Sequence, residues 1–485
     1  MNVRLMKLLP VAIALAVAPM FAHGEDLLDA YQQALANDPV LAQQVAQRNS
    51  TKENVPLSRA QLLPHLSAGL SFQQTSGNSG FGNNGICQDT TGQPVACPDY
   101  GHSRSRNASI QLTQTVLDFS KYANLSAAHA QADSADAQYQ AALQNLIVRV
   151  TTAYFDVLTA KDQVNFAKAN LDSLKRQYNQ AEQRFKVGLS AITDVQDAKA
   201  HYDTAQANLI VAQNALNDSR EALTQITGQP VSDLEELTDK LPMTPPTPNQ
   251  LSTWVDQARL NNPNILAQQY NVESAEHSIT AARDARLPTI DASVSYGKGA
   301  TWYQNGPYRS QPGNTTIGLT LNVPIFAGGA THAQIKQSIY QRDSAQAALT
   351  QQRRLVVRNT RNYFRSVTSG ISQVEAARQA VISSESALKA TKAGFLVGTQ
   401  TITQVLFAQG TLLQSQQQYS QARHQFILNK LLLEQAAGSL NVKDLKLVNA
   451  LLVPASDVQT PADAAEENGM PAAAAPQPTD TTATH

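Results

Sequence analysis

Two spacings of hydrophobic side chains occur along this chain, and they predict helices and strands in turn. Between residues 121 and 187, apolar positions such as Leu143, Leu146 and Val150 recur at intervals of three, four and seven, which is typical of an α-helix. The segment contains neither glycine nor proline, so it predicts a single helix of about 100 Å at about 1.5 Å per residue. Residues 331–397, also free of proline, predict a second helix of the same length.

Four further segments show the helical spacing over roughly half that length. They are residues 25–62, 191–227, 251–286 and 401–437. Two of these lengths add up to one long helix. The simplest packing is therefore an antiparallel coiled coil in which each long helix runs beside two short helices that are stacked end to end.

Strict alternation of apolar and polar residues predicts strands between the helices. The pattern gives each half of the chain one β-hairpin, over residues 66–116 and 288–324. Alternating segments of about ten residues suit tilted strands that cross a bilayer with one apolar and one polar face. A small soluble sheet that caps the helices is the alternative.

The hairpin loops are expected to be long and polar, from Thr75 to Ser105 and from Gly297 to Gly313. Cys87 and Cys97 are the two cysteines of the chain, and both lie in the first loop. In an exported protein such a pair is expected to form a disulfide.

The second half of the chain repeats the first. Phe185–Val195 returns as Phe395–Val405 with every position number raised by 210, and the register continues to Gly228 and Gly438. The sequence therefore predicts the tandem duplication of one structural unit. The two copies are residues 25–228 and 251–438.

The remaining segments flank or join the two copies. Residues 229–250 are rich in proline and are expected to cross the helices as an equatorial connector, with residues 439–453 as a C-terminal equatorial segment. Residues 454–485 are rich in Ala, Pro, Thr and Asp and are expected to be a disordered, dispensable tail. Residues 1–24 combine basic residues, an apolar run and a small-residue exit, which is typical of a cleaved signal peptide.

The composition argues against enzymatic and nucleic-acid chemistry. The formal net charge is −1, so no basic surface for nucleic acid is expected. The nine histidines are scattered, and no H-E-x-x-H, G-x-S-x-G or Walker-type motif occurs. A G-x-G-x-x-G at Gly80–Gly85 leads into Cys87 and does not open a helix. We expect no enzyme activity, no cofactor and no metal site.

Four strands cannot close a barrel, and an open strand edge in lipid leaves backbone groups without hydrogen bonds. The chain is therefore expected to oligomerise. Two copies would give eight strands and a barrel filled by side chains, whereas three copies would give twelve strands and leave a lumen.

Many ordered segments of the chain resemble the TolC family of outer-membrane channels, which serve Gram-negative tripartite efflux pumps and type I secretion systems. The resemblance covers nearly the whole mature chain. It is carried by Tyr31–Ala34, Asn37–Pro39, Leu62–Pro64, Ser109–Gln114, Thr152–Phe155, Arg184–Leu189, Ala191–Gln196 and Gln225–Gly228.

The resemblance implies an α/β membrane channel: a homotrimer whose twelve-stranded β-barrel, four strands per chain, is continued through the periplasm by an antiparallel coiled-coil α-helical barrel. Such a channel is a passive, gated exit duct in the outer membrane of a Gram-negative bacterium. The implied partners are outer-membrane lipid, a periplasmic adaptor (membrane fusion protein) and an inner-membrane transporter of the RND, ABC or MFS type.

The family resemblance also assigns the helical hairpin tips and the periplasmic gate. The tips that match the adaptor-docking positions are Val187, Gly188, Leu189, Val397, Gly398 and Thr399. The positions that match the gate are Asp194, Phe395, Gln400, Gln404 and Phe407. Glycine in these turns is also explained by chain reversal alone.

The gate positions depart from the family pattern, which has a tyrosine and an arginine as a latch and two aspartates as an acidic ring. Here Phe395 and Gln400 stand at the latch, and Gln404 and Phe407 at the ring. We therefore expect closure by amide hydrogen bonds and apolar packing, and weak binding of multivalent cations. Asp197 takes the place of Phe407 in the first repeat and is a candidate to compensate.

The alternative from another class is a periplasmic coiled-coil adaptor or a structural adhesin without a pore. Adaptors often carry a lipidated cysteine directly after the signal peptide. Glu25 occupies that position here.

Overall fold

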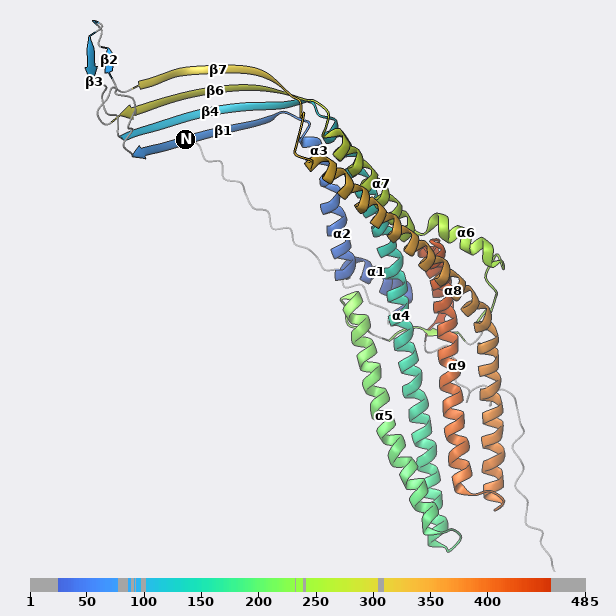
Figure 1. The fold of residues 1–485 in the computed structure, drawn as a ribbon. Helices are drawn as coiled ribbons and strands as arrows, with labels where there is room; N and C mark the ends of the chain where they lie inside the picture. The colour runs from blue at the N-terminus through green and yellow to red at the C-terminus, as the bar shows by residue number, and fades with distance from the viewer. Residues whose placement is uncertain are drawn as a thin grey trace, which may run out of the picture.

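The structure is an elongated helical body with a curved β-sheet projecting from one end (Figure 1). It is a computed structural model that describes residues 25–76, 86–88, 91, 93–96, 102–231, 233–238, 241–303 and 309–454. The side chains of residues 86–88, 94–96, 102 and 303 are not described. The expected signal peptide, and the expected tail from residue 455 onward, lie outside the described residues.

The helices form four columns. The long helices are α4 (Phe119–Lys186) and α8 (Ala330–Leu396). The shorter ones are α1 (Leu27–Asn37), α2 (Pro39–Lys52), α3 (Asn54–Ala60), α5 (Ile192–Thr227), α6 (Leu251–Asn261), α7 (Pro263–Asp284), α9 (Ile402–Ala437) and α10 (Val442–Asn449). The columns follow in the order α2 with α5, then α4, then α7 with α9, then α8.

Each long helix thus lies beside shorter helices that continue one another, which is the packing that the sequence predicts. Such packing stabilises helices that would have little stability of their own. Within the described part of the chain, no helix is both long enough and apolar enough to cross a membrane.

The single helix predicted over residues 25–62 is wrong, because the structure divides it into α1, α2 and α3. Pro39 has no N–H to donate and begins α2, and the Asp38 carboxylate caps this helix by accepting the N–H of Leu41 at 2.7 Å. Pro56, in the first turn of α3, likewise cannot continue the bonds of α2.

The single helix predicted over residues 251–286 is divided for the same reason into α6 and α7. Pro263 begins α7, and the Asn262 side chain accepts the N–H of Asn264 at 3.1 Å. The same side chain donates to the carbonyl of Ala436 at 3.0 Å, which ties the start of α7 to the end of α9.

The equivalent junction in the first repeat, between α2 and α5, is stabilised by an ion pair. Asp38 is 3% exposed, and its carboxylate lies 2.5 Å from the guanidinium of Arg149 on α4. Asn37 donates to the carbonyl of Thr227 at the end of α5, at 2.8 Å. The first junction therefore joins α2, α5 and the long helix α4, and the second joins α7 and α9.

The equator of the body has the largest apolar core. It packs α1 and α10 against the middle of α4, with Leu27, Leu146, Val150 and Leu445 fully buried. The connector and the C-terminal segment meet there, since β5 (Glu236–Leu237) pairs with β8 (Leu452–Val453).

The sheet is formed by strands from both repeats. Its order is β1 (His65–Ser76), β4 (His102–Leu117), β6 (Thr289–Tyr303) and β7 (Arg309–Asn322), all antiparallel. Two short strands, β2 (Ile86–Gln88) and β3 (Pro94–Ala96), pair with each other in the first loop. In the described chain β1 and β7 have a neighbour on one side only, so both outer edges of the sheet are open.

One face of the sheet is apolar and the other is polar. A cross-strand row on the first face consists of Leu66, Leu112, Val294 and Ile317, all of them exposed. The adjacent row on the opposite face consists of Ser67, Gln111, Ser295 and Thr316. An exposed apolar face of this kind is stable against lipid and not against water.

The strands extend further into the predicted loops than the alternation indicated. Strand β6 reaches Tyr303, although the second loop was expected to begin at Gly297. A cross-strand contact helps to extend the strand pairing into this region. The guanidinium of Arg106 on β4 lies 5.0 Å from the ring centroid of Trp302 on β6, in a diagonal position.

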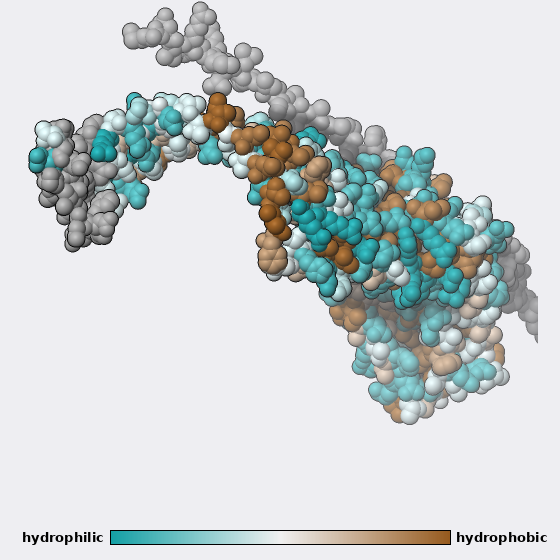
Figure 2. Space-filling view, turned by 45° about the horizontal axis from the view of Figure 1, so that its top comes forward, coloured by the Kyte–Doolittle hydropathy of each residue, from teal (hydrophilic) through white to brown (hydrophobic). Residues whose placement is uncertain are grey.

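Hydrophobic surface gathers where the sheet meets the helices (Figure 2). Among the exposed apolar side chains of this region, Ile325 and Phe326 are 93% and 88% exposed, and Leu63 and Phe119 contribute from the neighbouring turns. This band continues the apolar face of the sheet down to the first helical turns.

The junction glycines allow a direct test of the end-to-end packing. Gly438 ends α9 with φ of 79°, and a Cβ there would lie 2.5 Å from the carbonyl oxygen of Asn261. Gly188 has φ of 77° and open space around it. Alanine at either position costs about 1 kcal/mol of backbone strain. Gly438→Ala is expected to cost about 1–3 kcal/mol more, because the neighbouring backbone must move.

Thermal unfolding of both variants in detergent, followed by circular dichroism, compares these costs. Gly438→Ala should lower the unfolding temperature clearly more than Gly188→Ala does. Equal shifts would contradict the tight junction.

Candidate functional site

The two helical hairpins end in equivalent turns. Gly188 and Gly398 adopt the left-handed conformation, with φ of 77° and 81°. The N–H groups of Leu189 and Thr399 each donate to the carbonyl five residues earlier, at 2.8 Å and 2.9 Å. A helix that ends in this way reverses the chain within a few residues.

The tips expose apolar side chains. Val187, Leu189 and Val397 are between two-thirds and three-quarters exposed, and Gly188, Gly398 and Thr399 are exposed beside them. All six tip residues singled out in the sequence therefore lie on two matching surfaces at the end of the body farthest from the sheet.

Gln404 caps its own helix. Its side-chain oxygen accepts the N–H of Thr401 at 2.8 Å, and its own N–H donates to the hydroxyl of Thr401 at 3.3 Å. This reciprocal capping box fixes the start of α9. The side-chain oxygen of Gln404 is thus engaged within its own turn.

Gln400, Gln404 and Phe407 line one hollow of about 690 Å³ between α8 and α9. Phe407 is 77% exposed, so its ring has little contact with its own chain. The structure therefore brings three of the predicted gate residues together on one surface.

Phe395 has a partner that the sequence did not indicate. The guanidinium of Arg184, on α4, lies 4.8 Å from the centroid of the Phe395 ring, on α8. This cation–π contact joins the two repeats near their tips. The Asp194 carboxylate makes no hydrogen bond or ion pair with any other described residue.

A second contact between the repeats involves Asp197. Its carboxylate accepts a hydrogen bond from the hydroxyl of Thr403 at 3.5 Å. Beneath it, Leu174 and Ala205 of the first repeat form a buried cluster with Ile402 and Leu406 of the second. The tips of the two hairpins are therefore joined by apolar packing with polar contacts at the rim.

The Arg184 contact had one signal in the sequence. Arg184 corresponds to Gly394 in the second repeat, so the two copies differ at the position that faces the opposite hairpin. A comparison of the repeats marks this position but does not identify Phe395 as its partner.

Above the tips, α4 and α9 pack along a seam that contains polar side chains. Ser173 donates to Gln409 at 3.1 Å, and Thr159 bonds His424 at 2.7 Å. The ring of His424 also lies 5.2 Å from that of Phe155. Burial lowers the pKa of His424 to about 3, so the ring is neutral near pH 7 and packs as part of the seam.

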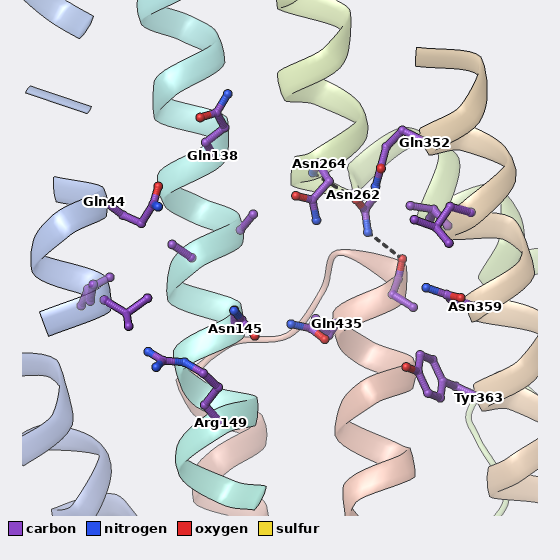
Figure 3. A pocket seen from close by; sticks show the side chains of 17 residues that line it. Gln44, Gln138, Asn145, Arg149, Asn262, Asn264, Gln352, Asn359, Tyr363 and Gln435 are labelled. Atoms are coloured by element: carbon purple, nitrogen blue, oxygen red, sulfur yellow. Dashed lines mark hydrogen bonds between the residues drawn. The ribbon is translucent and has the colours of Figure 1, made fainter. Parts of the chain in front are cut away.

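A groove lined by carboxamides crosses the columns at the level of the helix junctions (Figure 3). It has a volume of about 490 Å³ and receives side chains from α2, α4, α7, α8 and α9. The amide residues are Gln44, Gln138, Asn145, Asn262, Asn264, Gln352, Asn359 and Gln435. Among the described residues that line it, none is acidic.

The groove borders the equatorial core, since Leu41 belongs to both. On α4, Gln138, Asn145 and Arg149 share one face by their spacing of seven and four, whereas Val150 and Tyr154 point into the core. The groove therefore presents amide side chains together with the guanidinium of Arg149, which is paired with Asp38.

Two further predictions concern the loop and metal chemistry. Cys97 lies outside the described residues and the side chain of Cys87 is not described, so the predicted disulfide stays a prediction. Within the described ranges, no group of three or more His, Cys, Asp or Glu side chains is arranged to hold a metal ion.

The capping box at Gln404 can be tested by substitution. Gln404→Ala removes the acceptor for the N–H of Thr401, which costs about 1 kcal/mol. Local opening should then rise roughly five-fold, since 1.4 kcal/mol corresponds to a factor of ten. Hydrogen exchange over residues 399–408 measures this directly. Gln404→Glu keeps the acceptor and should keep the protection; unchanged exchange in Gln404→Ala would rule the capping role out.

Comparison with known proteins agrees with this architecture. The family model described as "Outer membrane efflux protein" matches residues 30–229 and 254–439, which is one match for each repeat. The predicted tandem duplication is thereby confirmed.

Among curated proteins, the chain is 35% identical to Outer membrane protein TolC of Escherichia coli (strain K12), over 93% of this chain and 90% of the relative. It is 27% identical to Alkaline protease secretion protein AprF of Pseudomonas aeruginosa, over 89% of this chain and 88% of the relative. Among solved structures, the CmeC outer membrane channel of Campylobacter jejuni superposes with a TM-score of 0.72 at 16% identity, covering 88% of this chain and 90% of that one.

Proposed function

Because the chain belongs to the outer membrane efflux protein family, we propose that three copies of it close into a tube that forms the passive exit duct of efflux pumps and type I secretion systems. The protein is an outer-membrane channel of this family. Its copy number, its gate residues and its partners are the parts that we propose.

The two-faced sheet is the observation that carries the proposal. Its exposed apolar rows suit lipid, and its polar rows suit an aqueous lumen. Both outer strands need a neighbour, since an unpaired edge within the hydrocarbon layer costs several kcal/mol for each backbone group. Three copies supply twelve strands, pair every edge and leave an open interior.

In the proposed tube, the helical columns continue the β-barrel into the periplasm. In this proposal the carboxamide groove faces the lumen. Its amide side chains present hydrogen-bonding groups to passing molecules, and its one charged side chain, Arg149, is already paired with Asp38. Transport through such a duct is passive, and the energy comes from the partner pump.

The entrance is closed in this proposal by contacts between the two repeats. Arg184 on Phe395 and Thr403 on Asp197 hold the tips of the hairpins together. Opening requires the second hairpin to move away from the first, which breaks both contacts. A periplasmic adaptor that grips the tips supplies the binding energy for this movement, and an inner-membrane transporter of the RND, ABC or MFS type delivers the substrate.

Single-channel conductance in planar bilayers tests the duct and its entrance together. We expect a small, stable conductance that a trivalent cation added on the periplasmic side leaves nearly unchanged, because Gln404 and Phe407 supply no carboxylate. Gln404→Asp combined with Phe407→Asp should introduce block by the cation, since several carboxylates would then converge on one opening.

Gln229→Asp, which places a carboxylate at an exposed position two residues after α5 and far from the tips, is the matched control and should leave the cation response unchanged. A parent channel blocked as strongly as the double variant would overturn the proposed gate. Failure to conduct at all would overturn the duct.

The tip surfaces can be tested with charge. Leu189→Asp and Val397→Asp place a carboxylate on the exposed apolar tips, which should abolish co-purification with the adaptor while leaving assembly intact. Leu260→Asp, at an equally exposed apolar position on α6, is the control. Normal adaptor recovery with both tip variants would contradict docking at the tips.

A further inference from the structure

One end of the sheet carries a cluster of basic side chains. Arg104 and Arg106 lie on β4 and Lys298 lies on β6, the two central strands, and all three side chains are exposed. They lie toward the end of the sheet that is farthest from the helices (Figure 1). None of the three forms an ion pair with a carboxylate among the residues that the structure describes.

The strand register places all three basic residues on the apolar face of the sheet. Leu112 and Val294 are direct partners in an apolar cross-strand row, and the pairing of β4 with β6 is regular from this row outward. Arg104 and Arg106 stand an even number of positions from Leu112, and Lys298 stands an even number from Val294. Because side chains alternate between the faces of a strand, the basic residues continue the apolar rows toward the far end.

The opposite face of these two strands is uncharged at the same height. It presents only small or neutral side chains there, from Ser103, Ser105, Asn107, Gly297, Gly299 and Thr301. The positive charge of the central strands is therefore concentrated on the face that the proposed barrel turns toward lipid.

The height of the cluster matches the border of the apolar layer of a membrane. Eleven positions separate Arg106 from Leu117, at the end of β4 next to α4. At about 3.3 Å per residue and a strand tilt of about 40°, this distance spans about 28 Å across a membrane. The apolar band of an outer-membrane barrel is about 25 Å tall. The guanidinium groups thus reach the layer of the lipid headgroups, and the long side chain of Lys298 can extend its ammonium group to the same level.

An aromatic ring orders the basic cluster. The guanidinium of Arg106 lies 5.0 Å from the centroid of the Trp302 ring, and Trp302 is the direct cross-strand partner of Arg104. Ala300, the direct partner of Arg106, is only 4% exposed, so side chains cover the sheet at this point. Tryptophan is typical of the boundary between a membrane and water. The arginines are therefore held in place before any ligand arrives.

Exposed apolar side chains lie directly beside the charges. Phe72, on β1, is the cross-strand partner of Arg106, and Leu70 lies two positions further inward on the same face. They are 73% and 89% exposed. A ligand that has both an anionic head and apolar chains complements this surface, whereas a soluble anion leaves the apolar part uncovered.

We propose that Arg104, Arg106 and Lys298 bind the phosphate groups of a lipid in the outer leaflet, with one site on each copy of the chain. A guanidinium matches a phosphate group through two parallel hydrogen bonds. The acyl chains of the same lipid lie along Leu70 and Phe72. The inference rests on the barrel proposed above, since the apolar face meets lipid only where the sheet closes within a membrane.

Native mass spectrometry of the full-length protein in dodecyl maltoside tests the site with lipid A, which carries two phosphate groups. Parent protein that has been freed of co-purified lipid should retain one molecule of lipid A for each copy of the chain. Dephosphorylated lipid A should bind clearly more weakly. Inorganic phosphate in large excess should not displace lipid A, because it has no chains to cover the apolar surface.

Substitution of the basic residues should weaken this binding in proportion to the charge removed. Arg104→Ala with Arg106→Ala should raise the dissociation constant for lipid A about 25-fold, since each basic side chain near a membrane surface contributes about a factor of five. Lys298→Ala should raise it about five-fold and leaves the contact between Arg106 and Trp302 in place. Arg104→Lys with Arg106→Lys keeps the charge and should keep most of the affinity.

Arg309→Ala is the matched control. Arg309 is exposed and pairs with Thr301, so it lies at nearly the same height but on the polar face of the sheet. This variant loses the same charge and should bind lipid A as the parent does. Single-channel conductance shows whether each variant still forms the channel.

The outcomes separate this site from the function on which it rests. Unchanged binding of lipid A by the Arg104 and Arg106 double variant and by Lys298→Ala, or an equal loss in Arg309→Ala, would overturn the site in a channel that still conducts. Equal binding of dephosphorylated lipid A, or displacement by inorganic phosphate, would overturn the assignment of a lipid phosphate. A parent protein that does not conduct would overturn the barrel itself.

Discussion

A helix of nearly seventy residues has to be covered along its whole length, and this requirement shapes most of the protein. Helices α4 and α8 contain 68 and 67 residues. A polar chain of this kind holds its helical form through packing rather than through the propensity of its residues. Neighbours that return along the same path supply that packing.

The neighbours are shorter helices, so each column contains a junction between two helix ends. Helix ends leave backbone groups without partners, and burying them requires specific side chains. Asp38 and Asn262 serve this purpose at the two junctions, and Gly228 and Gly438 let the lower helices end close to the upper ones. The duplication places the same solution at the same height in both repeats.

The sheet imposes a different requirement. Its strands come from both repeats, yet its two outer edges stay open and one of its faces is apolar. A single chain thus contains two unfinished surfaces, the strand edges in the sheet and the outer helices α5 and α8 in the body. In the proposed trimer, neighbouring copies pair the open edges of β1 and β7.

The large elements could be read from the sequence because they depend on long, regular patterns. The absence of proline predicted α4, whose ends lie within two residues of the expected ones, and alternation predicted the strands. The family resemblance identified the turns of the two helical hairpins as candidate adaptor-docking tips. Comparison of the two halves of the sequence predicted the duplication, and the match of one family model to both halves confirms it.

The features that sequence reasoning missed depend on single contacts. Pro39 and Pro263 were known from the sequence, but their role became clear only with the caps formed by Asp38 and Asn262. Gln404 was expected at the constriction, and its side chain caps α9 because Thr401 stands three residues before it. Arg184 needed the structure, because its partner Phe395 lies in the other repeat.

The central claim is that three copies of the chain together form one closed tube. Native mass spectrometry of the protein extracted from its membrane in mild detergent tests this most directly, since it counts copies without reference to any single contact. The account predicts one dominant species at three times the mass of the mature chain. A dominant monomer, dimer or tetramer would contradict it, because none of these gives twelve strands and twelve helical columns.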